Sequence, residues 1–245
     1  MSGRPFICCR GLEKAFRGTP VLRGVSLDVL AGETLVVLGG SGSGKSVLLK
    51  HMNGLLRPDR GEVEVDGTPL APLDEDGLIP VRRKVSMLFQ QGALFDSLTV
   101  GENVAYPLRE HRLVPDAAIP ARIREALAMV DLAGSEHHMP SELSGGMRKR
   151  AALARALVLE PRALLYDEPT TGLDPVTAAR INRLIRDVQR RLGLTSVVVT
   201  HDLGSAFLVA DRIAFLYEGR IRFTGTPDEA RAAADPVLHE FLTAA

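Results

Sequence analysis

Patterns typical of buried strands alternate with helical patterns along much of the chain. The continuous apolar run at residues 34–38 predicts a strand covered on both faces, and residues 46–53 after it predict a helix that ends at Gly54. Similar apolar runs at 163–166 and 195–200 predict two more strands of the same kind. Because strands that alternate with helices favour parallel pairing, the pattern predicts an α/β fold with a mostly parallel sheet.

Two further regions accompany this α/β core. Near the start, residues 21–30 and 61–66 have the pattern of strands, the second ending at an Asp66-Gly67 turn, and together they predict an N-terminal antiparallel β layer. Residues 92–160 show helical periodicity without a buried-strand pattern, which predicts an inserted α-helical lobe. We therefore expect one domain over residues 1–245, with the helical subdomain at approximately 92–160 inside it.

The composition excludes several classes of protein. With 245 residues, of which 45% are hydrophobic and 24% charged, the chain is not typical of a disordered protein. Lys and Arg number 30 and balance 30 Asp and Glu, so no global positive field attracts nucleic acid. Only two cysteines are present, Cys8 and Cys9, which we expect to be reduced thiols in an edge strand, and reduced thiols predict a cytoplasmic protein. No apolar run is long enough to cross a bilayer.

A glycine-rich loop follows the first predicted core strand. Its sequence fits GxxxxGKS and lies between a predicted strand and a predicted helix, which is the context that a phosphate-binding loop requires. The backbone N–H groups of such a loop converge on phosphate oxygens, Lys45 can reach the β- and γ-phosphates, and the Ser46 hydroxyl can ligate Mg²⁺. The residues predicted to bind a nucleoside triphosphate are Gly39, Gly40, Ser41, Gly42, Ser43, Gly44, Lys45 and Ser46.

Two carboxylates end the apolar run at 163–166. Asp167 and Glu168 come directly after it, at the strand end where a parallel sheet places its ligand. We expect Asp167 to belong to the Mg²⁺ site and Glu168 to act on the attacking water.

A second candidate anion site lies at residues 143–147, before a helix predicted over 148–159. Ser144 and two glycines there would leave N–H groups free at a helix N-terminus. The pentapeptide alone is equally consistent with a helix that Ser144 simply caps.

These motifs occur in a fixed order after the glycine loop: Gln90, the pentapeptide, the Asp-Glu pair, residues 171–174 and Thr200-His201. The ordered set resembles the ATPase subunit of an ABC transporter over nearly the whole chain. The resemblance implies a P-loop NTPase core that binds ATP and Mg²⁺, with Glu168, His201 and Lys45 as catalytic residues. It further implies an adenine contact at Phe16 and Val21, a Q-loop glutamine and Mg²⁺ contact at Gln90, a signature at Ser144, Gly145, Gly146 and Met147, a D-loop aspartate at Asp174 and a switch histidine at His201.

The chain departs from the family pattern at two of these positions. Met147 replaces the usual Gln of the signature, which removes one polar contact, and Phe16 replaces the more usual Tyr, which keeps the stacking face.

The resemblance also implies partners. Two ATPase subunits would close head to tail over ATP, so that the signature of one subunit covers the glycine loop of the other. Integral membrane permease subunits would hold this homodimer on the cytoplasmic face of the inner membrane, and additional substrate-binding or lipid-binding subunits stay open. Nucleic acid is not expected as a partner.

Four short sequence segments narrow the range of cargo that we expect. Residues 44–50, 92–98, 103–111 and 139–147 resemble the Mla/Mce-type ATPases that power phospholipid traffic between bacterial membranes. The alternatives are an ABC ATPase subunit for another small solute, such as a polar amino acid or an organic solvent, and a non-transport ABC ATPase. The exact cargo, the direction of transport and the other subunits stay open.

Overall fold

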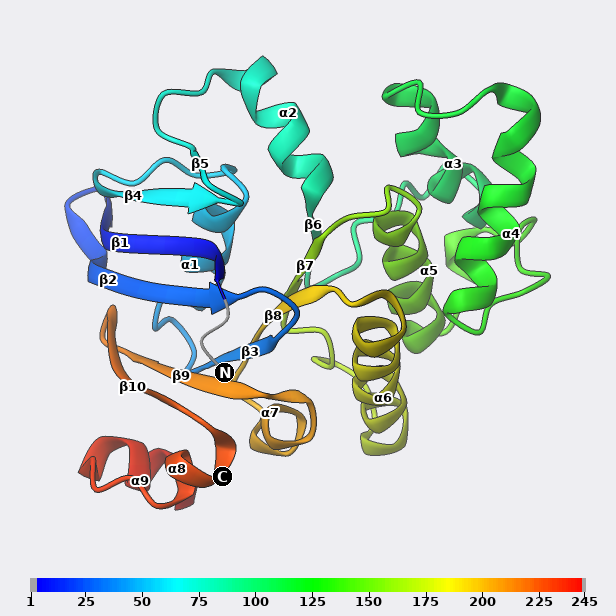
Figure 1. Ribbon diagram of the computed structural model, residues 1–245. Coiled ribbons are helices and arrows are strands. Elements are labelled where there is room, and N and C mark those ends of the chain that lie inside the picture. Colours follow the sequence, from blue (N-terminus) through cyan, green and yellow to red (C-terminus); the bar gives the residue numbers. More distant parts are fainter. Residues whose placement is uncertain (1–3, 244–245) are drawn as a thin grey trace.

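The computed structural model describes residues 4–243, which form two β-sheets and a lobe of helices (Figure 1). The smaller sheet has the strand order β2-β1-β4-β5 and is antiparallel throughout, which confirms the predicted N-terminal β layer. Its strands are β1 (Pro5–Phe16), β2 (Thr19–Leu30), β4 (Arg60–Val65) and β5 (Thr68–Pro69).

The larger sheet has six strands in the order β10-β9-β3-β8-β7-β6. All neighbouring pairs are parallel except β10 with β9, so the predicted mostly parallel sheet is confirmed. Its strands are β3 (Thr34–Leu38), β6 (Val85–Leu88), β7 (Ala163–Asp167), β8 (Thr195–Thr200), β9 (Arg212–Tyr217) and β10 (Arg220–Gly225).

The central strand β3 shows why this sheet is stable. All five of its residues are buried. Because side chains alternate along a strand, Leu35 and Val37 join the core that includes α1 and the small sheet, whereas Val36 and Leu38 join the core that includes the helical lobe. The continuous apolar run therefore fills two cores from a single strand.

Helices cover the sheet and form the lobe. The helices α3, α4 and α5 lie between β6 and β7 in the chain and gather to one side of the sheet (Figure 1). Residues 92–160 contain no strand, as expected, while the limits of a separate subdomain there stay a prediction. The helices are α1 (Lys45–Met52), α2 (Glu75–Lys84), α3 (Val100–Glu110), α4 (Ile119–Met129), α5 (Gly145–Leu157), α6 (Pro175–Leu192), α7 (Leu203–Val209), α8 (Pro227–Arg231) and α9 (Pro236–Thr243), with 3₁₀ turns at Asp116–Ala118 and Pro140–Glu142.

Two local predictions were wrong. Helix α5 begins at Gly145 and ends at Leu157, rather than spanning 148–159, because the Ser144 hydroxyl accepts the N–H of Met147 at 3.3 Å and caps the helix earlier. Strand β1, which carries Cys8 and Cys9, is not an edge strand, since it pairs with β2 on one side and with β4 on the other. Both cysteines are free thiols, and burial raises the pKa of Cys9 to about 12.

Within residues 4–243, no helix combines the length and the apolar character that crossing a membrane requires.

Candidate functional site

The glycine loop connects β3 to α1 and depends on backbone freedom at Gly44. This residue has φ +104°, a conformation that residues with a Cβ rarely adopt. A Cβ at Gly44 would also lie 3.2 Å from the carbonyl oxygen of Val21, so the loop packs closely against β2. Val21, a predicted adenine contact, is thereby placed beside the phosphate-binding loop.

Lys45 is the cation of this loop. Its side chain is only 6% exposed, and its Nζ donates to the carbonyl oxygens of Gly39 at 2.8 Å and Gly40 at 3.0 Å. The same Nζ lies 3.4 Å from Glu168 Oε1. The ammonium therefore lies between the glycine loop and the carboxylate that follows β7.

Ser46 and Asp167 form the second pair of the site. The Ser46 hydroxyl donates to Asp167 Oδ1 at 2.6 Å, which joins the first turn of α1 to the end of β7. A hydroxyl and a carboxylate are hard oxygen ligands of the kind that Mg²⁺ prefers, and Mg²⁺ sites of this type are completed by substrate phosphates and water. The donor set therefore fits Mg²⁺.

Glu168 is held by its main chain and by its side chain. Its N–H donates to the carbonyl of Val199 at 3.0 Å, and its φ of +47° turns the chain sharply at the end of β7. Its carboxylate accepts a hydrogen bond from Thr171 Oγ1 at 3.3 Å and lies 3.0 Å from Nδ1 of His201. The glutamate is buried, whereas half of the His201 side chain is exposed.

The signature segment packs against the segment that carries Asp174. A Cβ at Gly146 would lie 2.5 Å from Cγ2 of Thr177, so a larger residue there would have to displace the Thr177 side chain. Asp174 Oδ1 accepts the N–H groups of Val176 and Thr177, each at 3.0 Å, and so caps α6. Hydrogen bonds from Thr177, first from its side chain and then from its N–H, hold the pKa of Asp174 below its ordinary value.

The predicted site residues thus fall into two groups. Within the described chain, hydrogen bonds and ion pairs unite Lys45, Ser46, Asp167, Glu168 and His201. Gly39 and Gly40 join this group through the carbonyls that accept from Lys45. None of these contacts includes the remaining predicted residues, whose roles stay predictions: Ser41, Gly42, Ser43, Gly44, Phe16, which is 42% exposed at the end of β1, Val21, Gln90, which is exposed after β6, Ser144, Gly145, Gly146, Met147 and Asp174.

Two cations of α5 belong to none of the predicted motifs. Lys149 is buried and donates to the carbonyl oxygens of Gln90 and Glu168, and Arg155 donates to those of Gly92 and Ala93. Burial lowers the pKa of Lys149, while the charges of Glu168 and Asp167 oppose this shift. Lys149 is followed by apolar residues at i+3, i+4 and i+7, and this spacing could have placed it on the buried face of the helix.

A groove of about 440 Å³ lies beside these cations, between the Gln90 loop and the signature. Close to it, the exposed rings of Phe95 and Tyr106 pack with their centroids 4.9 Å apart. The groove is lined by Gln90, Gln91, Ala93, Leu94, Asp96, Pro140, Gly145, Arg148, Lys149, Thr171, Gly172 and Leu173.

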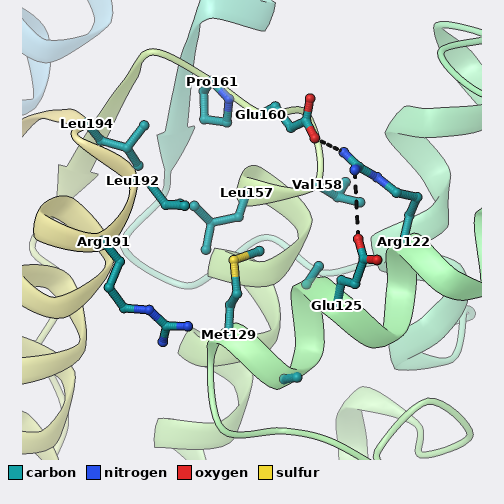
Figure 2. A pocket seen from close by; sticks show the side chains of 12 residues that line it. Arg122, Glu125, Met129, Leu157, Val158, Glu160, Pro161, Arg191, Leu192 and Leu194 are labelled. Carbon is teal, nitrogen blue, oxygen red and sulfur yellow. Dashed lines mark hydrogen bonds and ion pairs between the residues drawn. The ribbon is translucent and has the colours of Figure 1, made fainter.

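A larger cleft of about 700 Å³ lies elsewhere, between α4 and the C-terminal ends of α5 and α6 (Figure 2). Met129, Leu157 and Leu192 contribute apolar side chains, and Arg122 is joined to Glu125 and Glu160 at its rim. No residue of the predicted ATP site lines this cleft, so it is a separate surface.

Residues 22–171, which include the glycine loop, the signature and the Asp-Glu pair, match the family model described as ABC transporter. The chain belongs to the ABC transporter family. As an ABC ATPase it binds ATP, and its α/β P-loop fold is the cassette fold of that family.

Several proteins of the family are similar over most of the chain. The "Probable ribonucleotide transport ATP-binding protein mkl" of Mycobacterium leprae is 42% identical over 233 residues, which are 95% of this chain and 67% of that protein. Its counterpart in Mycobacterium tuberculosis H37Rv is 43% identical, and the chain spans 65% of its length. The "Intermembrane phospholipid transport system ATP-binding protein MlaF" of Escherichia coli K12 is 42% identical over 89% of this chain and 81% of that protein.

A solved structure supports the assignment of the ABC fold. The dimeric post-hydrolysis state of the cassette MJ0796, bound to ADP and Pi, superposes with a TM-score of 0.83 at 34% identity. The match covers 90% of this chain and 98% of MJ0796.

We predict that Lys45→Ala weakens ATP binding by roughly tenfold to a hundredfold, because charge-assisted bonds to phosphate contribute about 1.5–3 kcal/mol. Equilibrium titration of the purified chain with ATP measures this affinity. Lys50→Ala removes a charge from the last turn of the same helix and serves as the control, with unchanged affinity expected. Equal affinity of the Lys45 variant and the native chain would refute the assignment of the glycine loop.

Proposed function

We propose that the chain is the ATP-hydrolysing subunit of a membrane transporter, and that it dimerises around ATP to drive a permease. The observation that carries this proposal is the cluster in which Lys45 and His201 contact the carboxylate of Glu168 while Ser46 contacts Asp167. This cluster lies at the carboxyl ends of β7 and β8, beside the loop that follows β3, where a parallel sheet binds its ligand.

Each residue of the cluster has a task in phosphoryl transfer, which requires positioning and charge stabilisation. Lys45 and the N–H groups of the glycine loop neutralise the triphosphate. Glu168 orients the attacking water and accepts its proton, and His201, held 3.0 Å from that carboxylate, contacts the γ-phosphate. Ser46, Asp167 and Gln90 would hold Mg²⁺, which neutralises phosphate charge when bound.

A second copy of the chain completes the site in this proposal. The glycine loop leads into the N-terminus of α1, and the signature contains the N-terminus of α5. Because they belong to different helices of one chain, two chains arranged head to tail can bring each loop against the partner's signature. The dimeric structure of the similar cassette MJ0796 supports the formation of a dimer.

We place the permease contact at the groove beside Gln90. Exposed aromatic side chains are typical of protein interfaces, and Phe95, which packs on Tyr106, lies between the groove residues Leu94 and Asp96. A permease bound there would hold the homodimer on the cytoplasmic face of the inner membrane.

For the cargo we propose phospholipid that moves between the inner and outer membranes. The similarity to MlaF, a phospholipid transport ATP-binding protein by name, supports this cargo. The sequences of residues 103–111 and 139–147, which resemble those of the Mla/Mce-type ATPases, support it as well. The similarity to the mkl proteins, named for ribonucleotide transport, favours a second candidate, a soluble phosphate-bearing solute.

Glu168→Gln is predicted to slow ATP hydrolysis by roughly 10²–10⁴-fold, because the amide keeps the size of the side chain but accepts no proton. In the presence of ATP, the variant should then accumulate as a dimer. Phosphate release measures the turnover, and light scattering after gel filtration measures the mass. Native turnover by this variant would show that Glu168 is not the base.

Ser144→Arg tests the contact between subunits. The arginine side chain occupies the space where the partner's phosphate docks, so we expect the variant to bind ATP as a monomer without forming a dimer. The measurement is the molecular mass in ATP when the change is made in a Glu168→Gln chain, with Ser41→Arg in the chain's own loop as the contrasting variant that loses ATP binding. Dimer formation by the Ser144 variant would contradict the arrangement.

The cargo is tested with the chain and its permease purified together. We expect lipid extracts of the complex to contain phospholipid above the level of a detergent blank. We also expect ATP to move labelled phospholipid from vesicles that contain the complex, whereas a Lys45→Ala complex moves none. Transport of ribonucleotide or another small solute, with no phospholipid movement, would replace phospholipid by that solute and leave the ATPase assignment intact.

A further inference from the structure

Two cations of α5, the helix that begins in the signature and is called the signature helix below, hold the loop that follows β6. Lys149 Nζ donates to the carbonyl oxygen of Gln90. Two turns further along α5, the guanidinium of Arg155 donates to the carbonyls of Gly92 at 3.1 Å and Ala93 at 2.8 Å. The Gln90 loop, which we define as residues 90–93, is therefore attached to α5 at both of its ends.

Lys149 makes a second contact that Arg155 does not make. Its Nζ lies 3.5 Å from the carbonyl oxygen of Glu168, so one ammonium joins the Gln90 loop and the Glu168 turn. Lys149 is 7% exposed, and among residues 4–243 no carboxylate forms an ion pair with it. A buried charge without a direct ion pair is costly, and the two carbonyl oxygens compensate it together with the nearby charges of Glu168 and Asp167.

We propose that Lys149 is a positioning residue for ATP hydrolysis, which fixes the Gln90 loop and the Glu168 turn relative to the signature helix. This inference rests on the proposed function of Glu168 and Gln90. An ammonium has three rotatable donors and can serve two carbonyls that belong to separate segments, whereas an apolar side chain of the same length serves neither. When α5 moves together with the helical lobe, Lys149 moves the Gln90 loop and the Glu168 turn with this helix.

The test compares variants by hydrogen exchange and by kinetics. Lys149→Met keeps the length of the side chain and removes the donors, and Lys149→Gln keeps one amide donor. The matched control is Arg150→Met, since Arg150 also donates to backbone carbonyls, those of Val130 and Asp131, but these lie within the lobe. Exchange is measured on the full chain by mass spectrometry, at a temperature below the unfolding transition of every variant.

We expect Lys149→Met to speed amide exchange in the Gln90 loop and around Glu168 by about tenfold, the effect of losing a hydrogen bond of about 1.4 kcal/mol. The turnover number should fall by about the same factor while the affinity for ATP stays unchanged, because Lys149 does not contact the glycine loop. Lys149→Gln should recover part of both effects. Arg150→Met should change exchange in the lobe alone and keep native turnover.

Unchanged exchange at residues 90–93 and 168 in the Met and Gln variants would overturn the proposal. Equal effects of the Lys149 and Arg150 variants on these segments would also overturn it, since they would indicate general destabilisation. If the native chain hydrolyses no ATP, the proposed function fails, but the exchange measurement still decides whether Lys149 positions the two segments.

Discussion

The buried ammonium of Lys45 is the constraint on which the site depends. At 6% exposure it has lost most of its water, so protein acceptors must replace that hydration. The carbonyls of Gly39 and Gly40 and the carboxylate of Glu168 do so. A triphosphate is a stronger acceptor than a peptide carbonyl, so a phosphate oxygen can replace these carbonyls as the partner of the ammonium. The loop is therefore built to exchange weak acceptors for a strong one.

The parallel sheet is what allows Glu168 to reach that cation. Strand β8 lies between β3 and β7, and all three run in the same direction, so the residues after their carboxyl ends gather at one edge. Asp167 pairs with Val199 in the sheet register, and the residue after it turns with a positive φ toward Lys45 and His201. In an antiparallel sheet alternate strand ends would lie at opposite edges, and the cluster would not form.

Much of this arrangement could be predicted because it depends on local patterns. The apolar runs at 34–38, 163–166 and 195–200 marked three of the strands around the site, of which β7 extends one residue further, to Asp167. Strand β6 was missed because its four residues include Ser86, and β9 and β10 were missed at the C-terminal side. The early start of α5 depends on a single capping bond from Met147 to Ser144, which no apolar periodicity reveals.

Contacts between distant segments were the part that the sequence could not supply. Lys149 precedes Glu168 by 19 residues and follows Gln90 by 59, and its position next to both follows only from how α5 packs beside the ends of β6 and β7. Because Arg148 and Arg150 flank it, its charge looks like part of a solvated face. In the structure Lys149 lies on the face of α5 that also buries Ala152 and Leu153.

Glu168 is consequently the residue at which the two halves of the molecule meet. Its side chain contacts Lys45 and His201, which belong to the nucleotide half, while its main-chain carbonyl faces Lys149 of the signature helix. A change of charge at the carboxylate and a movement of the lobe therefore act on the same short turn. The 30 basic and 30 acidic side chains of the chain cancel overall. The electric field at the proposed phosphate site is therefore set by local charge pairs such as these.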